Sequence, residues 1–447
     1  MSTPDTPFRA IIVGGGPIGL AAAHALHLAG IDFVVLERRP AIFEDRGASL
    51  IVHPHTFRVL QQFGILDDLL PRGAELNHHL SFTADGHVFS EGNRYSLIRE
   101  NHGHGPVAFH RAELIEIMYN GLPETAKAKI FTGKKLTDIT TTADGVTATC
   151  ADGSTYHGSI VIGADGVYSK TRQIMRDIAL CDNPAQPWED PQHPYTATYQ
   201  LLYGSFPSPS PPGQGYDIQS SGKAIMYFSG PERSWFFLYK RLPAPTSERT
   251  HYTDRDVDTL AAEFADFPLT RTVKVKDIWP QMLGAGLTNL DEGIVKWWSL
   301  GRIVLVGDAC HKMTTHLGLG FNHGIQDVVE LCNRLRRAVR AASGGASPSL
   351  PVLTAIFERY QADRMSAASS LPGDVIKSGI ETRMHAWHNG WYYLLSRYLS
   401  VPNVVEKLFM RCVMAPEFRK GQVLDYVAGE ERMRGKISWI HPMRSTV

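Results

Sequence analysis

Short apolar runs and segments of helical character alternate along residues 8–70. The runs from Ile11 to Val13 and from Phe33 to Leu36 have the length of buried strands, and a largely apolar, helix-like segment separates them. A third run ends at Val52, and a helix is predicted from Pro54 to Phe63, where a glycine ends it. This alternation indicates a parallel sheet covered by helices.

The segment from His110 to Met118 predicts another helix. Beyond it, Asp-Gly pairs at 144–145 and 152–153 predict hairpin turns between short β runs. These runs end in Ile160 to Gly163, which has the character of a further buried strand.

The pattern changes after about residue 184, where prolines become dense. The stretches Tyr195 to Phe206 and Ala224 to Tyr239 predict long strands rich in aromatic residues, which suit a sheet with one face over a pocket. A buried strand is again predicted from Arg302 to Val306, followed by a helix from about Gly318 to Ala342. The chain is therefore expected to leave the first domain and return to it.

These elements predict an α/β protein in which a Rossmann-like nucleotide-binding domain is interleaved with a mainly antiparallel β-sheet substrate domain. We expect the first part of the nucleotide-binding domain in residues 1–183, interrupted by an insertion at about residues 75–108 that belongs to the substrate domain. The substrate domain is expected in 184–285 and the second part of the nucleotide-binding domain in 286–345. Residues 346–447 are expected to form a helical C-terminal region.

The glycine turn after the first strand predicts dinucleotide binding. Gly14 permits a tight turn, Gly16 lets the backbone approach a pyrophosphate, and Gly19 lets the helix pack on the strand. The helix N-terminus then faces the phosphates. Glu37 follows the next strand at the spacing at which a carboxylate accepts hydrogen bonds from ribose hydroxyls.

The charge balance argues against a nucleic-acid partner. With 45 basic and 45 acidic residues, the chain has no net field to attract a charged polymer, and a small neutral or apolar substrate fits better. Five scattered cysteines without a C-x-x-C pair favour a reducing compartment, so we expect a cytoplasmic protein.

Two segments bear on membranes. Ala10 to Ile31 lacks charged residues, but its glycines and Pro17 argue against a membrane span. The aromatic-rich stretch from Trp387 to Tyr398 is too short to span a bilayer and predicts either a packed helix or interfacial membrane contact.

No metal site is predicted. Histidine pairs at 53 and 55, 78 and 79, and 102 and 104 lack a carboxylate or cysteine at a recognisable ligand spacing. His311 is expected to fix the loop in which it lies.

Two further motifs narrow the class of nucleotide. Ile162 to Arg172 and Gly307 to Lys312 each place an aspartate just beyond a predicted strand. With the first glycine turn, they resemble the three sequence marks of flavin-dependent aromatic hydroxylases and epoxidases, the para-hydroxybenzoate hydroxylase-like class, over roughly residues 8–345. Residues 37–39, 46–49, 110–114, 203–206 and 298–309 are similar to fungal paxilline-type epoxidases, which act on terpenoid and prenylated metabolites.

The resemblance implies FAD as the resident cofactor. Asp308 would lie against the ribityl and pyrophosphate region, and Arg111 would reach the flavin phosphate or ribityl chain. Asp165 would hold the fold near the nucleotides, and Gly47 would lie beside the flavin. Capping or turn formation for the aspartates, a surface ion pair for Arg111 and a simple turn for Gly47 are the structural alternatives.

The segment His316 to Asn322 is expected to begin a helix whose N-terminus points at the flavin. A helix N-terminus stabilises nearby negative charge by up to about 2 kcal/mol when partly buried. Two departures from the class, Thr315 in place of proline and Leu319 in place of glutamine, lie near the face where oxygen reacts. The predicted cofactor-binding residues are Gly14, Gly16, Gly19, Glu37, Gly47, Arg111, Asp165, Asp308, Gly318, Gly320, Phe321 and Asn322.

Three residues of the middle domain are candidates for catalysis. Gln200 stands where relatives often carry a cation over the substrate. The missing cation suits a neutral substrate, or a reaction other than standard oxygen insertion. Tyr216 and Tyr227 are candidate pocket phenols, with packing within the sheet as the alternative for each.

The sequence therefore predicts an FAD-dependent monooxygenase that uses NAD(P)H and O2 to epoxidise or hydroxylate a bulky apolar metabolite. A flavoprotein dehydrogenase, or a cyclase or rearrangement enzyme without oxygen insertion, is the first alternative, because of Thr315 and Leu319. A non-catalytic binding module is the second.

Overall fold

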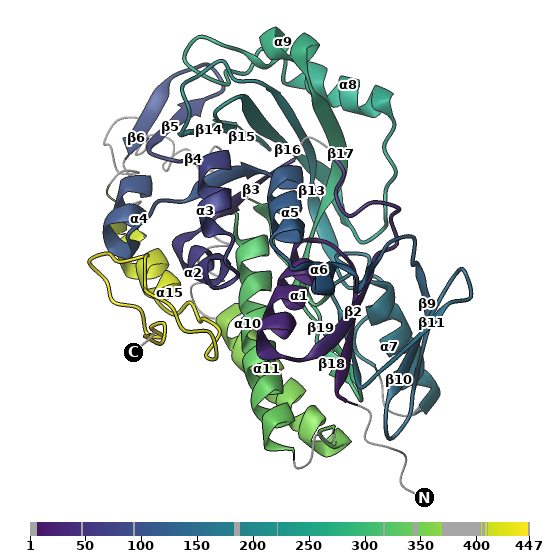
Figure 1. Ribbon diagram of the computed structural model, residues 1–447. Helices are drawn as coiled ribbons and strands as arrows, with labels where there is room; N and C mark the ends of the chain where they lie inside the picture. Colours follow the sequence, from purple (N-terminus) through teal and green to yellow (C-terminus); the bar gives the residue numbers. More distant parts are fainter. Residues whose placement is uncertain are drawn as a thin grey trace, which may run out of the picture.

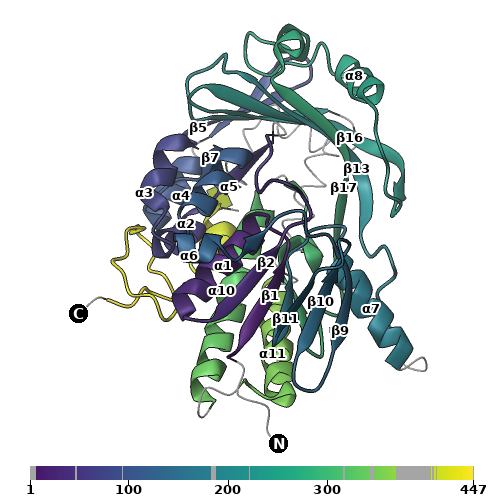
Figure 2. The ribbon, with the colours of Figure 1, turned by 45° about the vertical axis from the view of Figure 1, so that its right-hand side comes forward.

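The computed structural model describes residues 7–45, 48–92, 94–182, 188–220, 222–315, 318–342, 347–368, 404, 407–408 and 410–445. Gly47, His316, Leu317 and the aromatic stretch from Trp387 to Tyr398 lie outside the described residues. Figures 1 and 2 show a helix-covered sheet in the lower half of the molecule and a large curved sheet above it.

The lower sheet has the strand order β18-β19-β12-β1-β2-β8. Its inner strands are parallel and mostly apolar, because helices and the small sheet of residues 136–158 pack against them. Its strands are β1 (Arg9–Val13), β2 (Asp32–Leu36), β8 (Ile130–Phe131), β12 (Ile160–Gly163), β18 (Ser299–Leu300) and β19 (Ile303–Leu305).

The upper sheet has eight strands in the order β20-β17-β13-β16-β15-β14-β5-β6. Its strands are β5 (His78–Thr83), β6 (Val88–Gly92), β13 (Thr196–Pro207), β14 (Gln214–Ser220), β15 (Lys223–Ser229), β16 (Arg233–Thr246), β17 (Gly284–Ile294) and β20 (His311–Lys312). Because β5 and β6 join it, the early insertion contributes to this sheet, and β17 continues past the predicted boundary at residue 285.

One strand prediction needs correction. The stretch from Ala224 to Tyr239 is a hairpin of β15 and β16, because Gly230 turns back through a backbone hydrogen bond with Arg233. The aromatic pattern continues across the turn and conceals it.

The remaining strands form two small sheets. The hairpins predicted at the Asp-Gly pairs form β9 (Leu136–Thr141), β10 (Val146–Cys150) and β11 (Thr155–Gly158). The other sheet pairs β3 (Ser49–Val52) and β4 (Ala74–Glu75) with β7 (Val107–His110).

The helices divide between the two layers. Those around the lower sheet and the small sheets are α1 (Pro17–Ala29), α2 (Pro54–Gln62), α3 (Leu66–Leu69), α4 (Arg94–His102), α5 (Arg111–Asn120), α6 (Glu124–Lys127), α7 (Lys170–Asp182), α10 (Leu319–Ala341) and α11 (Leu350–Ala368). Above the upper sheet lie α8 (Asp254–Glu263) and α9 (Val275–Ile278). None of the described helices has both the length and the apolar character that crossing a membrane requires.

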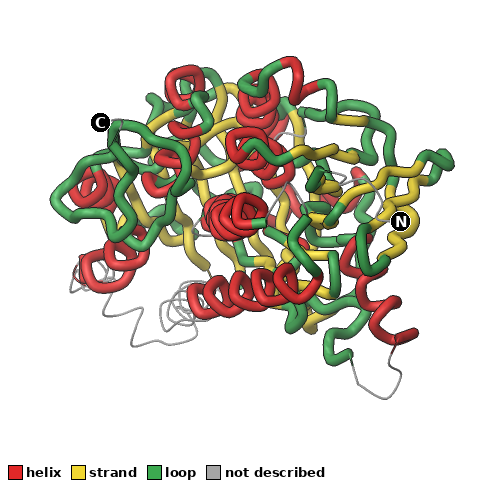
Figure 3. Tube along the Cα trace, turned by 60° about the horizontal axis from the view of Figure 1, so that its bottom comes forward, coloured by secondary structure: helices red, strands yellow, loops and turns green. Residues whose placement is uncertain are grey.

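The described C-terminal tail, residues 410–445, begins with a π-helical turn (Met410–Met414) and α15 (Ala415–Phe418). Figure 3 shows the rest of it as loop. Side-chain amides hold its backbone: Gln62 exchanges hydrogen bonds with the N–H and carbonyl of Leu424 (2.8 and 2.9 Å), and Gln326 does so with Gln422 (2.7 and 3.2 Å). Asn333 accepts from the Asp425 N–H and donates to the Val423 carbonyl.

Candidate active site

The three glycines of the first glycine turn, Gly14, Gly16 and Gly19, are needed for different structural reasons. Gly14 has φ +105°, and a Cβ there would lie 2.5 Å from the Ala164 carbonyl oxygen. A Cβ at Gly19 would overlap the Gly14 carbonyl, so both positions require glycine for packing. A Cβ at Gly16 would meet nothing within 4 Å. The backbone at Gly16, the N-cap of α1, therefore faces open space of the kind that a pyrophosphate fills.

Glu37 is a buried carboxylate at the end of β2. It accepts hydrogen bonds from the N–H of Gly15 (2.7 Å) and of Arg39 (2.9 Å). Burial opposes ionisation, but the hydrogen bonds from Arg39 and Gly15 prevail and lower the pKa of Glu37. The anion is thus held beside the glycine turn, where the fingerprint predicts the ribose.

Asp308 lies in the short turn that follows β19. Its carboxylate pairs with Lys312 at 2.8 Å, and a Cβ on Gly320 would lie 3.8 Å from its Oδ1. The first turn of α10 therefore lies beside Asp308, although these residues are far from Gly16 in sequence. Within the described residues, the fold brings the first and third motifs to the same side of the lower sheet.

Asp165 stabilises the start of α7. It accepts hydrogen bonds from the Ser169 hydroxyl (2.5 Å) and from the N–H of Thr171 (2.9 Å). From the same helix, Arg172 donates to the Ala309 carbonyl at 2.7 Å, while the Tyr195 hydroxyl donates to the Asp308 carbonyl at 3.1 Å. Asp165 therefore acts through α7 on the turn that carries Asp308. The sequence did not single out Arg172 or Tyr195 for this role.

A buried network supports that turn from the other side. Asp327 of α10 accepts from the Gly307 N–H (2.9 Å), from His311 Nε2 (2.6 Å) and from Arg364 Nε (2.7 Å). Burial opposes the charge of Asp327, but His311 and Arg364 lower its pKa well below the usual value. His311 thus fixes its loop, as the sequence predicts.

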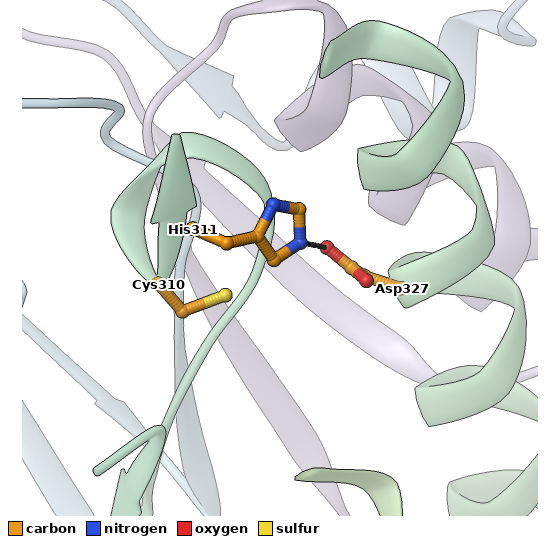
Figure 4. A group of neighbouring side chains, drawn as sticks. All are labelled: Cys310, His311 and Asp327. Atoms are coloured by element: carbon orange, nitrogen blue, oxygen red, sulfur yellow. Dashed lines mark hydrogen bonds and ion pairs between the residues drawn. The ribbon is translucent and has the colours of Figure 1, made fainter. Parts of the chain in front are cut away.

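Cys310, His311 and Asp327 place potential metal-ligand atoms within 4.8 Å of one another. Figure 4 shows His311 directed at Asp327, with Cys310 beside them. Both Asp327 oxygens are already engaged by protein donors, and burial raises the pKa of the Cys310 thiol, which disfavours the thiolate that a metal needs.

The residues at the start of α10 hold strand β3 against the helix. Asn322 donates to the carbonyls of Ile51 (2.9 Å) and Gly318 (2.6 Å) and accepts from the His53 N–H (3.0 Å). Gly318 has φ +62°, and Phe321 packs in the main core. The amide of Asn322 therefore positions the helix N-terminus through protein contacts.

Arg111 is the first residue of α5 and its side chain is exposed. Its N–H donates to the Ala48 carbonyl at 3.0 Å, next to the segment that contains Gly47. The preceding residue, His110, contacts Asp45 (2.8 Å) and the Trp235 indole N–H (3.4 Å). This is one of the places where the upper sheet meets the nucleotide-binding domain.

The three predicted catalytic residues lie on the outer face of the upper sheet. Tyr216 and Tyr227 stack on each other and belong to the apolar layer beneath α8 and α9. Gln200 lies directly opposite Lys240, whose ammonium pairs with Glu263 of α8 at 2.6 Å. Since directly opposed residues share a face, Gln200 belongs to that side as well. All three side chains therefore lie on the face away from the nucleotide-binding domain, and packing within the sheet explains the two tyrosines.

The inner face is formed by the strand residues that alternate with those of the outer face. It packs towards Ile51 and Ala108, which belong to β3 and β7 below the sheet. On this face, the hydroxyl oxygen of Tyr239 lies 2.7 Å from Thr315 Oγ1 and 3.4 Å from Met226 Sδ. The apolar residues of this face on the upper sheet are Tyr199, Leu201, Tyr203, Ala224, Met226, Phe228, Trp235, Phe237, Tyr239 and Leu290.

A polar group adjoins this aromatic face. Asp217 of β14 accepts from the Ser81 hydroxyl (3.0 Å), His79 Nε2 (3.2 Å) and an Arg94 N–H (3.2 Å). Sequence reasoning missed Asp217 and Tyr239, because nothing local shows which face of a strand looks inward.

Comparison with known proteins identifies the family. The family model for the FAD binding domain matches residues 8–178 and 219–368 of this chain. The chain therefore belongs to this family of FAD-binding proteins, and FAD is its cofactor.

Curated relatives extend the likeness over nearly the whole chain. The FAD-dependent monooxygenase srdH of Neurospora crassa is 32% identical over 454 residues, which cover 97% of this chain and 98% of srdH. The FAD-dependent monooxygenase ausM of Penicillium brasilianum is 31% identical, covering 89% of this chain and 84% of its own. The prediction of a flavin-dependent oxidoreductase of the monooxygenase class is confirmed.

Solved structures share the fold. Klebsiella pneumoniae HpxO complexed with FAD and uric acid has a TM-score of 0.69 at 23% identity, covering 91% of this chain and 97% of its own. The Diels-Alderase PyrE3 has a TM-score of 0.63 at 21% identity, covering 91% of this chain and 80% of its own. The predicted interleaved α/β fold is confirmed.

Proposed function

We propose that this flavin-dependent monooxygenase uses NAD(P)H and O2 to epoxidise or hydroxylate a bulky apolar metabolite, such as a terpenoid, meroterpenoid or prenylated alkaloid. The observation that carries the proposal is the aromatic inner face of the upper sheet, whose Tyr239 contacts Thr315, a residue that precedes α10 in the chain. The fungal relatives named FAD-dependent monooxygenases support the same class of reaction.

The residues present fit FAD. Gly16 and the N-terminus of α1 would hold the pyrophosphate, Glu37 the adenosine ribose, and Asp308 the ribityl chain. Arg111 stays a proposed contact to the phosphate or ribityl chain. Bound FAD would supply the exchange of electrons between NAD(P)H, O2 and the substrate.

The chain itself supplies electrostatics and shape. The N-terminus of α10, fixed by Asn322, would stabilise negative charge on the reduced cofactor by up to about 2 kcal/mol. The aromatic face would bind the hydrocarbon part of the substrate and exclude water from the reacting atoms. Asp165 and Asp327 contribute indirectly by fixing the turn around Asp308.

The test begins with purified protein and its FAD content. NADPH and NADH oxidation are then measured with a panel of farnesylated and geranylgeranylated aromatic compounds, and products are analysed after reaction under isotopically labelled O2. Labelled oxygen in a product supports the proposal. A converted substrate without label overturns it, and a protein that takes up no FAD contradicts every flavin-dependent role.

Dehydrogenation or cyclisation without oxygen insertion is the second candidate. The observation that favours it is the pair of departures at Thr315 and Leu319, at the approach to α10. Unlabelled product formed in the same experiment, with a changed ring count or loss of hydrogen, would establish it.

A further inference from the structure

The C-terminal tail reaches the approach to α10. Met410, Met414 and Phe418 form one apolar cluster with Leu319 and Ile98, and Met313 packs against it. Leu319 is the first residue of α10, and Met313 lies two positions before Thr315. We call these side chains the methionine cluster. In Figure 1 the yellow α15 lies beside α4, which carries Ile98.

The tail is fixed independently of this cluster. The guanidinium of Arg58, fully buried, donates to the carbonyls of Gly421 (2.8 Å) and His441 (2.5 Å) and pairs with Glu431 at 2.7 Å. Trp439 lies over the same guanidinium, 4.4 Å from it. These contacts attach the tail to α2. The positions of Met414 and Phe418 beside Leu319 therefore do not depend on the methionine cluster alone.

The cluster gives a physical reason for one departure from the flavin hydroxylase pattern. Where the class usually has glutamine, Leu319 is 6% exposed and surrounded by thioethers and an aromatic ring. An amide at this position would lose water without gaining a partner among these side chains. The apolar side chains of the tail therefore explain why leucine suits position 319 better than glutamine. The family model ends at residue 368, so the tail lies outside it.

We propose that the methionine cluster is a wall of the flavin site, in which Leu319 and Met414 are positioning residues that hold the start of α10 in place and keep water from the cofactor. The inference rests on the proposed function, since it requires FAD beside α10. Thioethers adapt to irregular shapes, which suits a wall next to a bulky hydrocarbon substrate.

The test uses full-length protein with Leu319→Gln and Met414→Gln. Iodide quenching of the bound flavin's fluorescence and hydrogen peroxide released per NADPH should both rise several-fold, because water reaches the cofactor. Leu319→Met should restore the wild-type values. The matched control is Met433→Gln, a buried methionine of the same tail that packs in the main core.

A purely structural role predicts something else. If Met433→Gln changes quenching and peroxide release as much as Met414→Gln at equal loss of thermal stability, the wall is refuted. It is also refuted if Leu319→Gln alters neither quantity. Amide hydrogen exchange of the peptide containing Leu319 and Gly320 gives a readout without flavin, and unchanged exchange in Met414→Gln would refute the positioning role. Absence of FAD from the wild-type protein would refute the proposed function instead.

Discussion

The hydroxyl of Tyr239 on the upper sheet lies 2.7 Å from the hydroxyl of Thr315 in the nucleotide-binding domain. Tyr239 is fully buried, and burial raises the pKa of its phenol, so the group stays protonated and is able to donate. Threonine at this position thereby connects the two halves of the proposed active site, which the proline usual in the class could not do through a side chain.

Removing the Tyr239 hydroxyl should weaken the contact between the upper sheet and the nucleotide-binding domain. In Tyr239→Phe the ring remains, but the hydrogen bond to Thr315 is lost, at a cost of about 1 kcal/mol in unfolding free energy. We expect less product per NADPH consumed and more hydrogen peroxide, measured with any substrate found in the panel.

The matched control for that variant is Tyr216→Phe. Tyr216 donates to Gln214 at 2.8 Å on the outer face, so its loss should leave product per NADPH unchanged. Equal uncoupling by both variants would contradict the assignment of the two faces.

Gly16→Ala should weaken FAD binding without unfolding the protein. A Cβ there has open space in the free protein, but it would occupy the approach of the pyrophosphate. We expect FAD affinity to fall at least about tenfold, which corresponds to about 1.4 kcal/mol. Titration of the FAD-free protein measures the affinity.

Gly19→Ala provides the contrast. Its Cβ would overlap the Gly14 carbonyl, so this variant should lose thermal stability even without FAD. A Gly16→Ala protein that binds FAD as tightly as wild type would refute the proposed pyrophosphate position.

Asp327→Asn should loosen the turn that carries Asp308. The change leaves Arg364 buried without its anionic partner, and breaking a buried pair costs about 3–5 kcal/mol. We expect a lower melting temperature and weaker FAD binding. Asp363→Asn, which alters a more exposed pair with Arg334, should change both much less.

Acid should destabilise the protein partly through His102. Burial and the nearby His53 lower the pKa of His102 from 6.5 to about 4, so the unfolded chain takes up the proton first. Its contribution to stability is present above pH 6.5 and is lost as the pH falls towards 4, by at most about 3 kcal/mol.

His102→Phe should therefore flatten the decline in unfolding free energy between pH 6.5 and 4, as measured by urea denaturation at several pH values. His87→Gln, which alters an exposed turn, is the control. An unchanged slope in His102→Phe would show that other groups cause the acid sensitivity.

The sequence predicted the parts of the site that depend on local geometry. The glycine turn, Glu37 and Asp308 each follow a strand directly, so spacing along the chain is enough to place them. The side chains that support these residues could not be predicted in the same way. Asp327 reaches Gly307 and His311 from α10, and Arg172 reaches Ala309 from α7, which is distant in the sequence.

The residues predicted for catalysis lie on the outer face of the upper sheet because of the register of its strands. Successive strand residues point to opposite faces, so Gln200 and Tyr199 differ only in which layer covers them. That depends on α8 and α9, whose position on the sheet no local pattern in β13, β14 or β15 reveals. Residues of the other parity, including Tyr203, Met226 and Tyr239, are the ones that face the nucleotide-binding domain.

The amides of Gln62, Gln326 and Asn333 grip peptide groups of the tail, not its side chains. The backbone of residues 422–425 is thereby positioned by polar side chains of α2 and α10. Because Met410, Met414 and Phe418 take no part in these contacts, replacing them would change the region beside Leu319 and leave the backbone attachment of the tail intact.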